Sequence, residues 1–218
     1  MTEIDRRALF AAGAMAGAAA IPLVASASAA PAANGRTFTA KPLPFDPTEI
    51  PCLSAKLLNS HHTNNYGGAV KRLGAITTQV IGLDPATTPE FTLNGLKREE
   101  LLAWNSMILH ELYFAGLGTP SRPGAALAAV IERDFGSQAR WQSEFSSMGK
   151  ALGGGSGWVL LTWSHRDSIL VNQWAADHTM TLADATPILA LDMYEHAYAI
   201  DYGANAGAYV DAFMKATN

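Results

Sequence analysis

The chain has 218 residues, of which 49% are hydrophobic and 16% are charged, and its formal net charge at pH 7 is −4. This length and composition predict a folded globular protein of one domain or two small ones, and they exclude a disordered chain. The acidic balance offers no basic surface for nucleic acid. A single cysteine, Cys52, excludes an internal disulfide and argues against a zinc–thiolate site.

The first 29 residues resemble an export signal of the twin-arginine type. Arg6 and Arg7 precede an apolar run rich in alanine and glycine, and Ala27-Ser28-Ala29 offers a cleavage site of small residues. A membrane anchor is the alternative, but the run is short and Pro22 interrupts it. We therefore expect cleavage, no stable membrane span afterwards, and export to a periplasmic or extracellular location.

Residues 30–51 are rich in proline and alanine, and we expect an extended leader whose end, Leu43-Pro44-Phe45, packs on the body. A helix is predicted over residues 53–80, because its inward positions recur at spacings of three to four. His61 belongs to this inward stripe. The stripe consists of Leu53, Leu57, His61, Asn64 or Asn65, and Ala69.

A turn-rich connection over residues 84–95 leads to a second helix at about residues 97–117. His110 lies in the middle of this helix among leucines, where it is either a core histidine or a ligand. Glycine and proline residues then cluster at 116–124 and predict a domain boundary. The first domain is therefore expected to be a helical hairpin at residues 52–118.

The second domain, residues 119–218, is expected to mix helices with a small sheet. Two amphipathic helices at 125–135 and 137–148 precede three apolar segments with strand composition. We expect the chain to be helical from Asp192 to its end. The fold class is therefore α+β, with a helical hairpin followed by an α/β domain that holds a three-stranded antiparallel sheet. The predicted strands are residues 158–163, 168–174 and 186–191.

Asp192 and His196 lie four residues apart directly after the apolar run 187–191. Carboxylate and neutral imidazole suit a first-row transition metal, and at this spacing both can face one point. The alternative is that Asp192 caps a helix and His196 packs in its core. Burying Asp192 without compensation is costly, so a nearby cation would explain its position. His61 and His110 complete a possible set of three histidines and one aspartate.

Several motifs together resemble the iron/manganese superoxide dismutase family. Asp192–Tyr198 is similar to the family signature Asp-x-Trp-Glu-His-Ala-Tyr, and the pairs Leu53-Ser54 and His61-His62 are similar to the motif of the first ligand. The order of the motifs along the chain is also that of the family. The remaining matches are Leu109–Phe114, Phe135-Gly136-Ser137, Gly155-Ser156-Gly157-Trp158 and Asp184-Ala185-Thr186-Pro187.

The resemblance implies a superoxide dismutase, an antioxidant oxidoreductase that converts superoxide to oxygen and hydrogen peroxide. One iron or manganese ion per subunit would be bound by His61, His110, Asp192 and His196, with a solvent molecule as fifth ligand. The metal would alternate between the +3 and +2 states. In the family, the residue matching Glu195 pairs with the metal-binding histidine of the partner subunit, which implies a homodimer.

The chain departs from the family where the substrate funnel and its proton network are expected. Asn65 stands where the family has a histidine, and Ala69 stands where it has a tyrosine. Tyr66 either compensates for these changes or simply packs. Tyr194 replaces a tryptophan and, with Trp158, is expected to wall the cavity.

In the family, a glutamine or histidine forms a hydrogen bond to the metal-bound solvent. In the family this residue comes from one of two places in the chain. Ser106, near the first of them, has too short a side chain for this role. His178 is near the second place and is the residue we expect in this role. The alternative is an exposed histidine in a turn.

Two other functions remain open at this point. The substitutions at Asn65 and Ala69 are compatible with a degenerate relative that binds metal or a partner without useful turnover. A mononuclear iron enzyme acting on an organic substrate is a further alternative, although a third histidine ligand argues against it. The choice between iron and manganese is also open.

Overall fold

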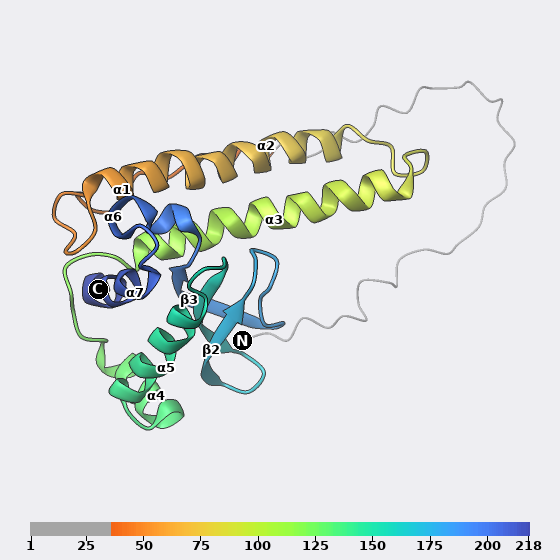
Figure 1. Cartoon of the computed structure of the whole chain (residues 1–218). Helices are drawn as coiled ribbons and strands as arrows, with labels where there is room; N and C mark the ends of the chain where they lie inside the picture. Colours follow the sequence, from red (N-terminus) through yellow and green to blue (C-terminus); the bar gives the residue numbers. More distant parts are fainter. Residues whose placement is uncertain (1–35) are drawn as a thin grey trace, which may run out of the picture. The chain divides into compact units, whose positions relative to one another are not determined.

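The computed structural model describes residues 36–218, and the predicted export signal at residues 1–29 lies outside them. Within the described part, helices precede and follow one small sheet, so the predicted α+β class is confirmed (Figure 1). Residues 36–54 contain no helix or strand. Phe38, Leu43 and Phe45 of this segment pack on the core, as expected for the leader.

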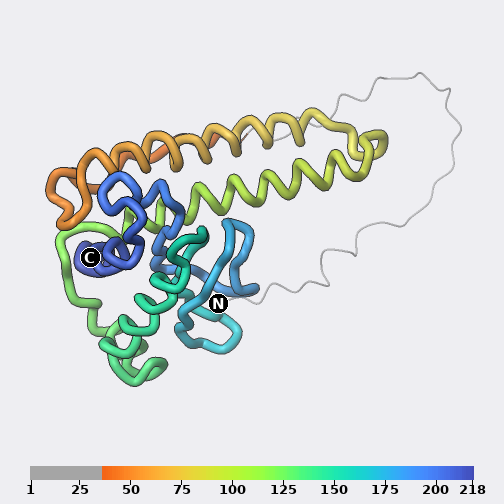
Figure 2. The backbone as a smooth tube through the Cα atoms, viewed as in Figure 1, coloured from red at the N-terminus to blue at the C-terminus, as the bar shows by residue number. Residues whose placement is uncertain are grey.

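The predicted hairpin is formed by α1 (Ala55–Ser60), a π-helix (His61–Tyr66) and α2 (Gly67–Ile81), which run in succession along α3 (Glu90–Ala115) (Figure 2). The Ser54 side chain begins α1 by accepting a hydrogen bond from the Leu57 backbone N–H at 3.1 Å. The first predicted helix is therefore confirmed in its extent but contains a π-helical insertion.

The π-helix changes which residues face inward. Hydrogen bonds from i to i+5 bring residues five positions apart onto one face, so His61 and Tyr66 are both buried. The stripe predicted with α-helical periodicity is confirmed at Leu53, Leu57, His61 and Ala69, which are all buried. Of its two alternative members, Asn64 and Asn65, Asn64 is exposed. Asn65 is only half-buried.

The second helix begins seven residues earlier than the expected start at residue 97. The Pro89 carbonyl accepts hydrogen bonds from the N–H groups of Thr92 and Leu93, which starts α3 at Glu90. Gly95 therefore lies inside the helix, where a Cβ would meet nothing within 4 Å. An exposed helical glycine costs only about 1 kcal/mol, so tertiary packing overrides this turn signal.

The helices α4 (Ala125–Phe135) and α5 (Gln138–Ala151) confirm the two predicted amphipathic helices. Gly136 ends α4 in the left-handed region at φ 82°, a conformation that favours glycine. Ser137 then caps α5 by accepting a hydrogen bond from Arg140 N–H. The sequence Phe135-Gly136-Ser137 is thus the turn between the two helices.

The sheet consists of β1 (Trp158–Ser164), β2 (Ile169–Ala175) and β3 (Ala185–Asp192), antiparallel and in the order β2-β1-β3. All three strands were predicted. The register pairs Trp158 with Asp192, so the start of β1 lies beside the end of β3. A bulge interrupts this pairing next to Pro187, where the missing N–H of proline is tolerated.

The continuous helix expected from Asp192 to the end is wrong. Asp192 is the last residue of β3, and it is followed by a 3₁₀-helix (Glu195–Ala197), α6 (Ala199–Tyr202) and α7 (Ala206–Ala216). Gly203 adopts φ 54°, and the Asn205 side chain caps α7 by accepting from Ala208 N–H. These turn residues interrupt the helix and allow α7 to pack on α5.

One core extends through both parts of the described chain. It combines Leu57 and Leu109 of the hairpin with Leu160 of the sheet and Phe213 of α7. The segment between α3 and α4 coincides with the predicted boundary at residues 116–124, but the division into two domains stays a prediction.

Gly157 gives a test of this arrangement. Its φ is 136°, and a Cβ there would overlap the carbonyl oxygen of Ala175 in the neighbouring strand. Gly157→Ala should lower the free energy of unfolding by about 3 kcal/mol, through backbone strain plus the clash. The thermal midpoint should then fall by about 6–12 °C.

Gly154→Ala is the matched control, because Gly154 has φ 83° but open space around it. Backbone strain alone predicts a loss of only about 1 kcal/mol. Equal losses in the two variants would contradict the close approach of β1 and β2 at this point.

Candidate metal centre

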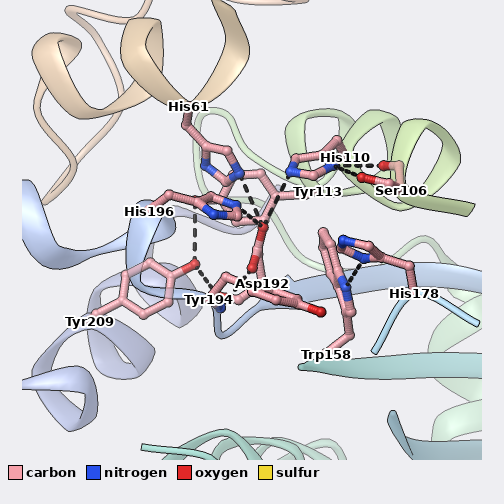
Figure 3. Close-up of polar contacts among 10 residues, drawn as sticks. All are labelled: His61, Ser106, His110, Tyr113, Trp158, His178, Asp192, Tyr194, His196 and Tyr209. Carbon is pink, nitrogen blue, oxygen red and sulfur yellow. Dashed lines mark hydrogen bonds and ion pairs between the residues drawn. The ribbon is translucent and has the colours of Figure 1, made fainter. Parts of the chain in front are cut away.

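Four separate elements bring the four predicted ligands to one point. His61 begins the π-helix, His110 lies in α3, Asp192 ends β3, and His196 lies in the 3₁₀-helix. Their donor atoms all lie within 4.8 Å of one another, and Figure 3 shows the three imidazole rings gathered around the carboxylate. The side chains of His61, His110 and Asp192 are at most 1% exposed, whereas that of His196 is 26% exposed.

The two oxygens of Asp192 have different partners. Oδ1 accepts a hydrogen bond from the Tyr194 backbone N–H at 2.9 Å. Oδ2 faces the three Nε2 atoms, at 3.1 Å from His61, 3.1 Å from His196 and 3.5 Å from His110. One carboxylate oxygen and three imidazole nitrogens therefore converge.

The hydrogen bond of His110 tests whether a metal fits. Its Nδ1–H donates to the Ser106 carbonyl oxygen at 2.6 Å, so in the neutral ring Nε2 carries a lone pair. This buried Nε2 makes no hydrogen bond within residues 36–218, and it faces the Asp192 oxygen at 3.5 Å. Two lone pairs facing each other in a buried site repel, and a cation among the four donors removes the repulsion. The donor set fits a first-row metal ion.

The electrostatics agree with a neutral His61, a neutral His110 and an ionised Asp192. Burial lowers the pKa of His110 to about 3, and burial also lowers the pKa of His61, against the opposing hydrogen bond to Asp192. Burial opposes the ionisation of Asp192, but the hydrogen bonds and the coulombic interactions with His196 and His61 together outweigh it and hold the pKa of this carboxyl well below its usual range. At neutral pH these are the protonation states that metal binding requires.

Two buried tyrosines hold the backbone of Asp192. The Tyr209 hydroxyl of α7 donates to the Asp192 carbonyl oxygen at 2.8 Å, and it lies 3.4 Å from the Tyr113 hydroxyl (Figure 3). Burial raises the pKa of both phenols, so both stay protonated and can donate. The end of β3 is therefore held by the C-terminal helix.

His178 lies in the turn after β2, but its ring is half-buried and packs against the centre. Its ring centroid is 6.2 Å from that of His110 and 5.0 Å from that of Tyr194, on which it stacks. The Trp158 indole N–H donates to His178 Nδ1 at 2.8 Å (Figure 3). Since an indole can only donate, Nδ1 accepts, and the neutral ring carries its proton on Nε2. Burial lowers the pKa of His178.

The other predicted site residues differ in whether they contact the four candidate ligands. Trp158 is buried beside His110, Tyr194 stacks on His196, and Glu195 is exposed. Asn65 makes no side-chain hydrogen bond within residues 36–218. The Tyr66 hydroxyl bonds to Glu111 and to the leader, and none of its hydrogen bonds involves the four candidate ligands.

Comparison with known proteins establishes the family. A family model described as iron/manganese superoxide dismutases, C-terminal domain, matches residues 123–218. The iron superoxide dismutase of Cupriavidus metallidurans is 66% identical over 178 residues, which are 82% of this chain and 90% of that protein. The chain belongs to the iron/manganese superoxide dismutase family.

More distant members of the dismutase family are named for either metal. A manganese superoxide dismutase of Halobacterium salinarum is 32% identical over 178 residues, covering 80% of this chain and 87% of that protein. The iron superoxide dismutase of Pyrobaculum aerophilum is 28% identical over 189 residues, covering 84% of this chain and 89% of that protein. Iron and manganese are thus both represented among the relatives of this dismutase.

The residues that orient the candidate ligands leave no signal in the sequence. The Ser106 carbonyl sets the tautomer of His110, but a backbone carbonyl leaves no signal in residue type. Tyr209 lies 17 residues after Asp192, at a distance along the chain that no short motif covers. Such contacts are visible only in the folded chain.

Asp192→Asn is expected to abolish tight metal binding. The change removes the only anion among the four donors and replaces one oxygen by a donor group, so affinity for iron or manganese should fall by more than about 100-fold. Metal content of the purified protein, measured by elemental mass spectrometry, provides the readout.

Asp211→Asn, an equal change of charge at an exposed position of α7, is the control and should keep its metal. Retention of a full complement of metal by Asp192→Asn would show that the ion binds elsewhere.

Proposed function

We propose that this protein disproportionates superoxide at a mononuclear iron or manganese site held by His61, His110, Asp192 and His196. The observation that carries the proposal is the convergence of three imidazole nitrogens on one buried carboxylate oxygen, all within 4.8 Å. Membership of the dismutase family and the 66% identity to an iron enzyme support the same activity. That identity favours iron as the working metal.

The reaction converts two superoxide anions and two protons to oxygen and hydrogen peroxide. When bound, an iron or manganese ion supplies the one-electron exchange that oxidises one superoxide and reduces the next. Asp192 supplies the negative charge of the ligand set, and burial keeps His61 and His110 neutral. Asp192 therefore stabilises a cation at the site, and the histidines supply lone pairs without adding charge.

His178 is proposed to hydrogen-bond the solvent at this site. The bond from Trp158 leaves its Nε2–H as a donor, and stacking on Tyr194 fixes the plane of the ring. Donors aimed at a solvent ligand change its proton affinity and the reduction potential of the ion that holds it. His178 would thereby affect both proton delivery and the choice of metal.

The exposed edge of the centre is proposed as the approach for superoxide. His196 is the one ligand with appreciable exposure, and Tyr194 stacks on it with an interplanar angle of 14°. The half-buried ring of His178 completes this edge. Trp158 and Tyr194 then form its aromatic wall, as the resemblance implies.

The roles of Asn65 and Tyr66 in proton transfer stay predictions. The half-buried Asn65 is a candidate for a hydrogen bond to solvent. Tyr66 is occupied by Glu111 and the Lys41 backbone, and this arrangement favours its packing role over its catalytic one.

We also propose that the protein is exported and works as a homodimer. The paired arginines and the small-residue cleavage motif of residues 1–29 support export to a periplasmic or extracellular location. The exposure of Glu195, one residue before His196, supports a contact with a partner subunit. No helix within residues 36–218 has the length and apolar content needed to cross a membrane.

The decisive assay is superoxide decay followed by stopped flow, with the mature protein loaded separately with iron and with manganese. We expect decay far above the free-metal control with at least one metal, and the identity to the iron enzyme favours iron. A fully loaded protein that does not accelerate decay would exclude the dismutase activity and leave a metal-binding relative.

His178→Ala should retain its metal but lose about 10–100-fold in superoxide decay rate, because a hydrogen bond to solvent at the site is removed. The midpoint potential of the bound metal should shift as well. His165→Ala is the control, since His165 is exposed and its side chain hydrogen-bonds only to Thr186 among residues 36–218. An unchanged potential and rate in His178→Ala would leave this histidine with a packing role.

A further inference from the structure

Lys41 of the leader binds both helices that carry the first two candidate ligands. Its backbone N–H donates to the Tyr66 hydroxyl at 2.8 Å, and its carbonyl accepts from His62 Nε2–H at 2.8 Å. Its ammonium group pairs with Glu111, and the Tyr66 hydroxyl donates to the same carboxylate at 3.0 Å. We call Lys41, His62, Tyr66 and Glu111 the Lys41 clamp.

The clamp residues lie next to candidate ligands in both helices. Glu111 follows His110 in α3, and His62 follows His61 in the π-helix. The Phe114 ring packs against both His61 and Tyr66, with centroids 5.1 Å and 6.3 Å away. The clamp is therefore one residue from a ligand on each helix, yet it makes no hydrogen bond to the ligand side chains.

The π-helix connects the hydrogen bonds of the clamp to the orientation of the His61 side chain. His61 and Tyr66 are the first and last residues of this helix, and the i to i+5 pattern is what places both on the buried face. In an α-helix, residues five positions apart diverge by about 140°, so one of the two would turn away from the core. Fixing the Tyr66 hydroxyl therefore opposes a return to α-helical register.

We propose that the Lys41 clamp is a positioning device that holds the π-helical register and thereby keeps His61 directed at the metal. The leader thus contributes to metal retention although it supplies no ligand. This inference rests on the proposed assignment of the ligands. Tyr66 and Glu111 carry most of the effect, because Tyr66 is buried and the carboxylate of Glu111 is 22% exposed. The Lys41 ammonium contributes little, since its side chain is 71% exposed.

The test is the rate of metal release to an excess of chelator from loaded parent protein and variants. Tyr66→Phe should release metal about tenfold faster, the typical effect of losing a hydrogen bond to a charged group. Glu111→Gln should act in the same direction, and Lys41→Met should change the rate less than about threefold. Release rates of Tyr66→Phe and Glu111→Gln within about twofold of the parent would overturn the proposal.

Glu99→Gln is a matched control. Arg72 of α2 pairs with Glu99 of α3, so this ion pair also joins the two helices of the hairpin, but at a distance of eleven residues from His110 along α3. Its release rate should equal that of the parent. Equal acceleration in Glu99→Gln and Glu111→Gln would show a general loosening of the hairpin and would also overturn the proposal.

Amide hydrogen exchange of the metal-free proteins separates this inference from the ligand assignment. The backbone amides of Tyr66→Phe should exchange faster than those of the parent protein over residues 61–70 and at the same rate over residues 97–105. This exchange pattern supports the clamp whether or not metal binds at residues 61, 110, 192 and 196. Failure of the parent protein to bind metal at these residues would refute the ligand assignment alone. Unchanged exchange over residues 61–70 would refute the clamp.

Discussion

The structure depends on one buried negative charge, that of Asp192. An ionised carboxylate removed from water is stable only if compensating groups surround it closely. Here His61 and His196 hydrogen-bond one carboxylate oxygen, the Tyr194 N–H hydrogen-bonds the other, and a cation among the four candidate ligands would complete the compensation. Burial of this carboxylate is costly, and the groups placed to offset that cost come from the elements that meet at this point.

Each element that meets there has a physical reason to do so. The central strand β1 is buried on both faces and orients β3, so that the end of β3 carries Asp192 into the core. Packing of α3 on β3 brings His110 alongside. The π-helix, finally, directs His61 and Tyr66 to the same side. Neither the hairpin nor the sheet alone contains a complete ligand set.

The two sides of the centre differ in a way that suits redox chemistry on a small anion. Behind Asp192, the buried phenols of Tyr113 and Tyr209 stay protonated and exclude water. On the other side, His196 and the half-buried His178 border solvent. This difference supports the proposed approach of superoxide and protons from the side of His196 and His178, with the metal held on the buried side.

Apolar periodicity and strand composition are local properties of the sequence, and they predicted the α+β class and the order of the elements. The four residues that converge were predicted by the resemblance of several motifs to those of the dismutase family. Local patterns did not predict the start of α3, where packing on α2 overrides the turn signal of Asn94-Gly95, or the break near Gly203 in the last helices. The π-helical register, the tautomers of His110 and His178, and the contacts of Lys41 and Tyr209 became visible only in the folded chain. These features depend on backbone groups and on partners distant along the chain, whose approach no local pattern of residue types encodes.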